Sequence, residues 1–275
     1  MYGRLMGIFS KKCANPKYSF ITVNYRSATA LGRMFRSFPP DFFTQGEFII
    51  INNDKEESLL LQKMFQKIGF VRILETKENI GFACACNRGV QAARGDIVFF
   101  LNPDVRFLSA APASSWKQDF FGNEPIIMAP ILLRYGHEEP WSSGRIVSPW
   151  GIFLQNIFPF AKIWAFFSRK SLGWVSGAAF AIRKTDFDSL NGFDEKYFLY
   201  YEDVDFCRRA KGKGLEIRRN DMVYFSHRGG ASHIEGKEKQ KKYYYASQDR
   251  YIQKYYGPAW LSVFRFCRFC RLLFS

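Results

Sequence analysis

One turn in the sequence carries an amide and a carboxylate at the end of a short apolar run. The run is Ile97–Leu101, and Asn102-Pro103-Asp104 follows it directly. A short apolar run bounded by turn residues is typical of a buried strand. Open α/β sheets bind ligands just outside the carboxyl ends of such strands, and hard divalent cations prefer oxygen ligands. Asp104 is therefore a candidate to hold a divalent cation, although Asn-Pro-Asp is also good chemistry for a plain turn.

A second cluster of acidic residues follows an aromatic segment. Glu202, Asp203 and Asp205 lie within a stretch that directly follows Tyr200 and Tyr201. A carboxylate beside an aromatic wall could act as a general base that removes a proton from an acceptor hydroxyl. Acidic residues are also common in the first turn of a helix, because they interact favourably with the helix dipole. The spacing alone leaves both interpretations open.

The third candidate is His227, in the segment FSHRGGAS. Histidine is a good metal ligand and a good partner for a phosphate. Two glycines and Ser232 follow it, which indicates a backbone that approaches another group closely. A single histidine after a strand is also often an ordinary hydrogen-bonded residue, and this alternative stays open. His137 and His233 have no comparable context.

These side chains need a frame of strands and helices to bring them together. The sequence predicts strands at 18–24, 47–53, 71–74 and 97–101, and helices at 28–37, 57–68 and 81–94. Such alternation is typical of an α/β fold with a mostly parallel central sheet flanked by helices. Asn79 precedes the last, alanine-rich helix and Asn87 lies within it, which favours a nucleotide-diphosphate site at this edge of the sheet.

The second half is more aromatic and less regular. We expect a strand at 174–182, a loop at 191–201, a helix at 202–211, strands at 215–218 and 222–226, and helices at 239–255 and 259–274. No stretch rich in Pro, Gly or Ser separates the halves. The predicted organisation is an N-terminal tail at 1–16, one domain at 17–257, and a C-terminal amphipathic basic helix at 258–275.

Composition narrows the possible partners. Of the 275 residues 47% are hydrophobic, enough for a sizeable core, and the net charge of +15 points to an anionic partner. The basic residues are spread along the chain without a recognition motif, so we expect no nucleic acid partner. The one CxxC, Cys267 and Cys270, lacks a second pair to complete a zinc site. Free thiols, no signal peptide and no apolar run long enough to span a membrane together favour a cytoplasmic protein.

The end of the chain favours contact with a membrane surface. Arg265, Arg268 and Arg271 recur every third residue, which places them on neighbouring positions of one helix face, with apolar residues between them. A helix of this length and charge fits an interfacial position on the inner face of the plasma membrane better than a spanning one. The alternative is a helix that packs on the domain. The apolar segment 150–167 could form a second such surface, and a lipid-linked acceptor would explain both.

Four ordered motifs resemble glycosyltransferase family 2, and more specifically its rhamnosyltransferase-like branch. Residues 79–105 follow the pattern NxGFxxAxNxGxxxAxGDxxxxLNPDV nearly throughout. Residues 192–208, GFDEKYFLYYEDVDFCR, and residues 227–232 are two further matches. Ser247 and the segment 254–257 form a weaker one. The resemblance covers roughly residues 18–257 and implies an inverting enzyme of GT-A fold.

The resemblance also implies roles for individual residues. Asp104 occupies the metal position of a DXD-like motif in which Asn102 replaces the first acid, and His227 helps to hold the metal or the diphosphate. Asp203 falls on the catalytic base, with Glu202 beside it. The implied nucleotide-sugar site consists of Tyr25, Asn52, Asp54, Asn79, Asn87, Asn102 and Asp104. The implied acceptor side consists of Trp174, Gly177, Ala178, Asp194 and Glu195.

Two positions depart from the family. Asn52 stands where the family usually has Asp, although Asp54 lies close, and Arg26 replaces a frequent Asn. Both departures concern recognition of the nucleotide base and neither touches the catalytic carboxylate.

The resulting expectation is an inverting hexosyltransferase that uses Mg²⁺ or Mn²⁺ and moves a sugar from a nucleotide-diphospho-sugar to a lipid-linked or glycan acceptor of a bacterial surface polysaccharide. Rhamnose is the leading sugar by resemblance. Galactose, galactofuranose or glucose from a UDP donor is the alternative. A catalytically inactive family member that serves as an assembly partner is the alternative from another class, which the retained Asp104, Asp203 and His227 disfavour.

Overall fold

The computed structural model describes residues 13–108, 124–151, 172–227 and 236–273. The first half contains β1 (Tyr18–Asn24), α2 (Ala28–Ser37), η1 (Pro40–Phe43), β2 (Gly46–Asn52), η2 (Lys55–Glu57), α3 (Ser58–Phe65), β3 (Val71–Glu75), α4 (Phe82–Ala92), β4 (Ile97–Leu101) and β5 (Val105–Phe107). The second half contains β6 (Ile126–Arg134), β7 (His137–Glu138), β8 (Ser143–Gly144), β9 (Trp174–Val175), β10 (Ala179–Arg183), α8 (Lys184–Ser189), α9 (Glu202–Gly212), β11 (Glu216–His227) and α10 (Lys237–Leu273).

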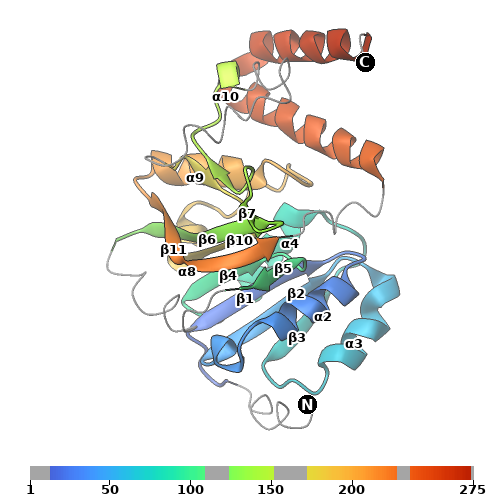
Figure 1. The fold of residues 1–275 in the computed structure, drawn as a ribbon, viewed down its shortest axis with the longest axis vertical. Coiled ribbons are helices and arrows are strands. Elements are labelled where there is room, and N and C mark those ends of the chain that lie inside the picture. The colour runs from blue at the N-terminus through green and yellow to red at the C-terminus, as the bar shows by residue number, and fades with distance from the viewer. Residues whose placement is uncertain (1–12, 109–123, 152–171, 228–235, 274–275) are drawn as a thin grey trace.

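One large sheet runs through the middle of the molecule (Figure 1). Its strand order is β3-β2-β1-β4-β10-β6-β11-β5, with β7 paired to β6. β3, β2, β1 and β4 are parallel, and β10 is antiparallel to both β4 and β6. β6 therefore points the same way as β4, and β11 is parallel to β6. The expected α/β fold with a mostly parallel sheet is confirmed, with β10, β5 and β7 running against the common direction.

The sheet is buried on both faces, which explains why its strands read as continuous apolar runs. In β2, Phe48 and Ile50 belong to one core cluster, whereas Ile49 and Ile51 belong to the other. Side chains of a strand alternate between faces, so neighbouring residues enter different cores. α2 and α3 cover one face, and α4, α9 and α10 cover the other (Figure 1).

α4 lies close against the sheet because Gly89 faces Ile21. A Cβ atom on Gly89 would come within 2.5 Å of Ile21 Cγ2. Gly81, at the start of the helix, has φ +81°, and a Cβ there would come within 2.6 Å of the Phe198 carbonyl oxygen. That carbonyl accepts a 2.7 Å hydrogen bond from the amide of Phe82. The two glycines therefore hold α4 between the sheet and the loop that precedes α9.

One segment of the second half differs from expectation in continuity. The expected strands at 215–218 and 222–226 are one strand, β11, whose register along β6 shifts between Asn220 and Tyr224. The two expected C-terminal helices are confirmed as the two arms of α10, which Gly257 separates with a non-helical φ of +84°. Pro258 follows and begins the second arm, which suits its fixed φ and missing amide hydrogen.

The second arm of α10 folds back onto the first. Asp249 of the first arm lies 2.8 Å from Arg265 Nε and also pairs with Arg268. These two arginines therefore face the protein. The expected packing alternative is thus present in part, since Leu261 and Phe264 are also buried. Within the described ranges, no helix is long and apolar enough to cross a membrane, and residues 152–167 of the second expected apolar surface lie outside those ranges.

Candidate active site

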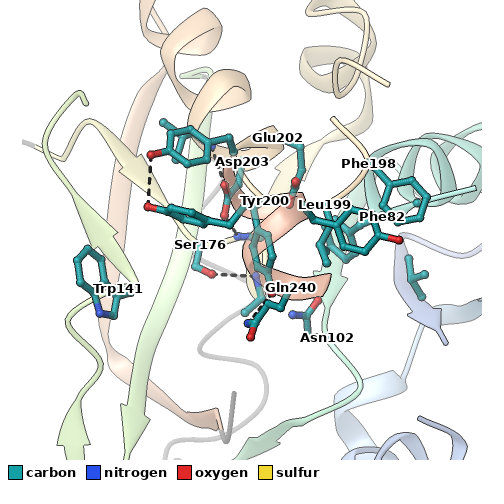
Figure 2. Close-up of a pocket in the computed structure, with 18 of the residues that line it drawn as sticks. Phe82, Asn102, Trp141, Ser176, Phe198, Leu199, Tyr200, Glu202, Asp203 and Gln240 are labelled. Atoms are coloured by element: carbon teal, nitrogen blue, oxygen red, sulfur yellow. Dashed lines mark hydrogen bonds between the residues drawn. The ribbon is translucent and has the colours of Figure 1, made fainter. Parts of the chain in front are cut away.

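A cavity of about 620 Å³ opens at the carboxyl ends of the parallel strands. β1 contributes Val23 and the following Tyr25, β4 leads into Asn102, and β11 ends at His227. Figure 2 shows Glu202 and Asp203 at one end of this cavity, with Phe82 and Phe198 to one side and Trp141 to the other. This is the edge at which open α/β sheets bind their ligands.

His227 and Glu139 line one part of the cavity, and Asp104 lies beside His227; these three residues are here named the Asp104 end. β5 and β11 pair with His227 opposite Val105, which brings His227 Nε2 to 3.5 Å from Asp104 Oδ1. On the other side of the ring, Nδ1 lies 2.7 Å from Oε2 of Glu139. Burial lowers the pKa of His227, but the hydrogen bonds to Asp104 and Glu139 outweigh it and raise the pKa to about 9.

The Asp104 end can give an oxygen and a nitrogen to a divalent cation once the cation displaces the hydrogen from His227 Nε2, because a pKa of about 9 keeps the ring protonated at neutral pH without metal. Two ligands that share one octahedral or tetrahedral ion are about 3 to 3.5 Å apart, and the 3.5 Å between Asp104 Oδ1 and His227 Nε2 agrees with that separation. No three His, Cys, Asp or Glu side chains of the described residues are grouped to hold a metal by themselves. Asp104 and His227 therefore fit a cation whose remaining ligands come from a bound molecule or water.

The start of α9 forms another part of the cavity wall. Asp203 Oδ2 accepts a 2.8 Å hydrogen bond from the Gly177 amide, and Oδ1 accepts one of 2.8 Å from the Val204 amide. Burial raises the pKa of Asp203, against the lowering effect of these amides. A carboxylate with a raised pKa in a cavity is suited to accept a proton.

Glu202 has a different environment from Asp203. It is buried, and its Oε2 atom has no hydrogen-bond partner among the described residues. Burial and the charge of Asp203 raise the pKa of Glu202 well above its usual value. Burying two like charges next to each other is costly, so the two carboxyl groups disfavour being ionised together.

The chain reaches α9 through two residues in the left-handed region. Tyr200 has φ +71° and Tyr201 has φ +65°, a conformation that costs of order 1 kcal/mol or more at each non-glycine residue. Gln240 donates a 2.8 Å hydrogen bond to the Tyr200 hydroxyl, and Gln248 donates one of 2.9 Å to the Tyr201 hydroxyl. Both glutamines belong to α10, so this helix holds the turn that aims Glu202 and Asp203 into the cavity.

Asp205, the third acid of the cluster, faces away from the cavity. It is fully buried and accepts hydrogen bonds from Tyr255 at 2.8 Å, Arg209 at 2.8 Å and Lys254 at 2.6 Å. The three acids of the cluster therefore have different surroundings, and the role of a general base stays a prediction. Glu202 and Asp203 line the cavity, while Asp205 fixes α9 to α10.

Most of the predicted site residues gather here. The cavity is lined by Tyr25, Asn79, Asn102, Trp174, Gly177, Ala178, Glu202, Asp203 and His227. Asp104 does not line the cavity, but it contacts His227, which does. Asn52, Asp54, Asn87, Asp194 and Glu195 also lie outside the lining, and each has a role in building the loops around the site.

Asn52 and Asp54 build the loop after β2. The Asn52 amide donates to Ser58 at 3.1 Å and to Glu75 at 2.7 Å, while Asp54 caps η2 by accepting from the Glu56 amide at 3.1 Å. The neighbour Asn53 lines the cavity instead. Contact of Asn52 and Asp54 with a nucleotide base stays a prediction.

Asn87, Asp194 and Glu195 hold the loop before α9. The Asn87 side chain accepts from the Phe193 amide and donates to its carbonyl, both at 2.9 Å, and donates to Glu195 at 2.9 Å. Asp194 pairs with Arg250 at 3.0 Å and with Lys254 at 2.9 Å. These three residues therefore position α9 from behind, and acceptor binding by Asp194 and Glu195 stays a prediction.

Several residues that line the cavity lie outside the four sequence motifs and were not predicted. They are Glu139 and a group of aromatic side chains. Trp141 follows β7, and Tyr243, Tyr244 and Tyr245 come from α10. The three consecutive tyrosines were the available signal, since exposed aromatic residues on a polar helix often mark a binding surface.

Two family models match separate regions of this chain. Residues 19–111 match the family model described as glycosyl transferase family 2, and residues 165–235 match the model described as the N-terminal domain of galactosyltransferase. The predicted resemblance is thereby confirmed: the chain carries a glycosyl transferase family 2 region on a GT-A fold.

Three particular proteins illustrate the likeness. The low-salt glycan biosynthesis hexosyltransferase Agl10 of Haloferax volcanii is 22% identical over 74% of this chain and 65% of its own length. The N-acetylglucosaminyl-diphospho-decaprenol L-rhamnosyltransferase of Mycobacterium tuberculosis is 27% identical over 56% of this chain and 57% of its own. The mannosyltransferase PcManGT from Pyrobaculum calidifontis, solved with GDP-Man and Mn²⁺, has a TM-score of 0.51 at 13% identity, over 97% of this chain and 80% of its own. The chain thus spans less than two thirds of these two curated relatives.

Proposed function

We propose that this protein is a metal-assisted, inverting glycosyltransferase that moves a sugar from a nucleotide-diphospho-sugar to a hydroxyl of a glycan precursor. The observation that carries the proposal is one cavity that is lined both by His227, the partner of Asp104, and by Asp203, a carboxylate of raised pKa. A sugar donor and a sugar acceptor need these two kinds of group on opposite sides of the reacting carbon.

The reaction follows from these two groups. The nucleotide lies along Tyr25 and Asn79, with its diphosphate toward Asp104 and His227. Asp104 and His227 would hold a divalent cation there, which would supply Lewis-acid stabilisation of the charge on the departing diphosphate. Asp203 takes the proton of the acceptor hydroxyl while the hydroxyl oxygen bonds to the anomeric carbon. The bond from that carbon to the diphosphate oxygen breaks on the opposite face, and the configuration inverts.

The Gly177 and Val204 amides orient Asp203 for this step. Each amide donates a 2.8 Å hydrogen bond to one oxygen of the carboxylate. The two hydrogen bonds therefore fix the orientation of the Asp203 carboxylate. Burial and the charge of Asp203 raise the pKa of Glu202 beside it well above its usual value, which favours Asp203 as the charged member of the pair. The aromatic side chains Trp141 and Trp174 are placed to pack on sugar rings and to exclude water.

Rhamnose is the sugar we assign first, because rhamnosyltransferases are among the relatives. A galactosyl, galactofuranosyl or glucosyl transfer from UDP is the second candidate, favoured by solved structures of similar fold that hold UDP. A lipid-linked acceptor is supported by the name of the mycobacterial relative.

Attachment to the inner face of the cytoplasmic membrane completes the proposal. α10 carries nine Lys or Arg and two Asp or Glu residues, and Val263, Phe266 and Phe269 on its second arm are exposed. A basic helix with exposed aromatic side chains suits an anionic lipid surface. A membrane-bound enzyme would meet a lipid-linked acceptor without leaving the surface.

A panel of nucleotide-sugars with Mn²⁺ tests the proposal. Binding is measured by calorimetry and turnover by release of nucleoside diphosphate, with dTDP-rhamnose, UDP-galactose, UDP-galactofuranose and UDP-glucose as donors. We expect one donor to bind and to be turned over, including slow hydrolysis in the absence of acceptor. A correctly folded protein that binds and hydrolyses none of the panel would instead support an inactive assembly partner.

A further inference from the structure

Glu139 belongs to the Asp104 end, but it lies outside the four sequence motifs. It is buried, with 7% of its surface exposed, and its Oε2 atom lies 2.7 Å from His227 Nδ1. An ionised carboxylate can only accept hydrogen bonds, so Nδ1 of His227 must carry the hydrogen of this contact. The other ring nitrogen, Nε2, is the one that faces Asp104.

The backbone around Glu139 fixes where its side chain lies. Tyr135 and Gly136 form the hairpin turn between β6 and β7, with φ values of +52° and +82°. The turn returns the chain along β6, and the Glu139 amide donates to the Leu132 carbonyl at 2.8 Å. Ser142 then binds the Glu139 carbonyl through its amide at 3.1 Å and its hydroxyl at 2.8 Å. Glu139 is therefore held on both sides of its Cα atom.

The same hairpin lies beside His227 because of the sheet. β6 and β11 are parallel, with Leu133 opposite Ser226. β7 folds back on β6 with Glu138 opposite Leu133. Glu139 and His227 thus lie at the same edge of the sheet although 88 residues separate them.

We propose that Glu139 is a positioning residue: it holds the His227 ring so that Nε2 is directed toward Asp104 and the two side chains are pre-set to share one divalent cation. The inference rests on the proposed function for the identity of the ligand. A carboxylate bound to the second nitrogen of a metal-ligating histidine fixes its tautomer and ring orientation, and its removal typically costs about 10- to 100-fold in metal affinity.

Arg134 is the other charged group near Glu139, 4.0 Å from its second oxygen. Its side chain is 44% exposed, so the ion pair is largely screened by water. The contact with His227 is shorter and less exposed. Glu139 therefore acts chiefly on the histidine.

The test uses the full chain without any sugar donor. Mn²⁺ binding is followed by electron paramagnetic resonance of the free ion, in the wild type, Glu139→Ala and Glu139→Gln. We expect Mn²⁺ affinity to fall about 10- to 100-fold in Glu139→Ala. Glu139→Gln keeps an acceptor for the Nδ1 hydrogen, so its loss should be clearly smaller. Glu138→Ala is the matched control, since Glu138 lies one residue earlier in the hairpin and pairs with Arg219 instead.

A second readout needs no metal. The chain has three histidines, so ¹⁵N signals of the imidazole rings can be assigned with a His227→Gln variant. The inference predicts that the His227 signals change in Glu139→Ala and keep their wild-type pattern in Glu139→Gln. Thermal unfolding of each variant identifies any that fail to fold, and Glu139→Gln, which preserves size and an acceptor, then carries the test.

The outcomes separate this inference from the proposed function. Glu139→Ala with wild-type Mn²⁺ affinity and unchanged His227 signals overturns the positioning role, whatever the sugar assay gives. Equal losses in Glu139→Ala and Glu139→Gln also overturn it, because they would assign the effect to charge alone. A wild-type protein that turns over a nucleotide-sugar yet binds no Mn²⁺ refutes the inference and leaves the transfer reaction standing.

Discussion

Replacing Asp203 by Asn tests the assignment of the base most directly. The substitution keeps the size of the side chain and removes the ability to accept a proton. Loss of one general base lowers the rate by about 10²- to 10⁴-fold, which corresponds to about 2.7 to 5.5 kcal/mol of activation free energy. The proposed nucleotide contacts are Tyr25, Asn79 and the Asp104 end, so the affinity for the nucleotide should stay at its wild-type value.

The structure also sets a cost for folding in this variant. The two Asp203 oxygens each accept from a backbone amide, of Gly177 and of Val204. An asparagine turns its own NH₂ group toward one of these amides, and one buried hydrogen bond is lost. We expect a loss of about 1 to 3 kcal/mol in the free energy of unfolding, well below what would unfold the domain.

The assay is release of nucleoside diphosphate with the donor that the panel identifies, alongside calorimetric titration of the nucleotide and thermal unfolding. Asp188→Asn is the control, because Asp188 is exposed on α8 and pairs only weakly with Lys184. Turnover of Asp203→Asn within threefold of wild type would refute the assignment. In the wild type the rate should fall on the acid side at a pH above the usual range of an aspartate, since burial raises the pKa of Asp203.

Three further predictions concern the surface, the loops and the acid stability of the fold. Phe266→Ser together with Phe269→Ser should weaken sedimentation with vesicles of anionic phospholipid at least tenfold, because both side chains are exposed on the second arm of α10. Gly81→Ala should destabilise the protein by more than about 1 kcal/mol in chemical unfolding, because of its left-handed φ and the 2.6 Å approach to Phe198. Asp194→Asn should remove an acid-sensitive contribution to stability: its pKa is lowered to about 2, since its hydrogen bonds to Lys254 and Arg250 outweigh burial. That contribution is fully present above about pH 3.8 and is lost as the pH falls toward 2.

Each of these has its own control. Leu59→Ser removes an equally exposed apolar side chain from α3 and should leave vesicle binding unchanged; equal losses would show that any exposed apolar residue acts alike. Gly136→Ala, at a left-handed glycine with open space around it, measures the cost of φ without the clash, so equal costs would refute the contact with Phe198. Melting temperatures of wild type and Asp194→Asn should converge toward pH 2, and a constant gap would contradict the ion-pair explanation.

The parts that sequence could predict are those with local signals. The apolar run Ile97–Leu101 and the turn after it show the strand end that carries Asp104, and motif order supplied Asp203 and His227. Glu139 could not be found in this way, because its link to His227 depends on a hairpin and on the pairing of β6 with β11. No local pattern marks that contact.

Two other expectations did not include the partners that the structure shows. The arginines near the end of the chain were interpreted as a basic face, and their counterion, Asp249, lies 16 and 19 residues earlier and meets them only through the kink at Gly257. The Asn52 amide donates to Ser58 and Glu75, and one Asp54 oxygen caps η2, so contact of either residue with a nucleotide base stays a prediction. Spacing in the sequence predicts where a side chain lies along a helix or strand. It does not predict which other side chains will bind it.

The left-handed pair Tyr200 and Tyr201 has a consequence for how this protein would respond to selection for heat resistance. Glycine at either position would relieve the backbone strain, but it would also remove a large side chain that packs on the core, and Tyr201 is buried there. It would also remove a hydroxyl that α10 uses to hold the turn before Glu202. Selection for heat resistance should therefore retain both tyrosines, together with the strained turn that they hold.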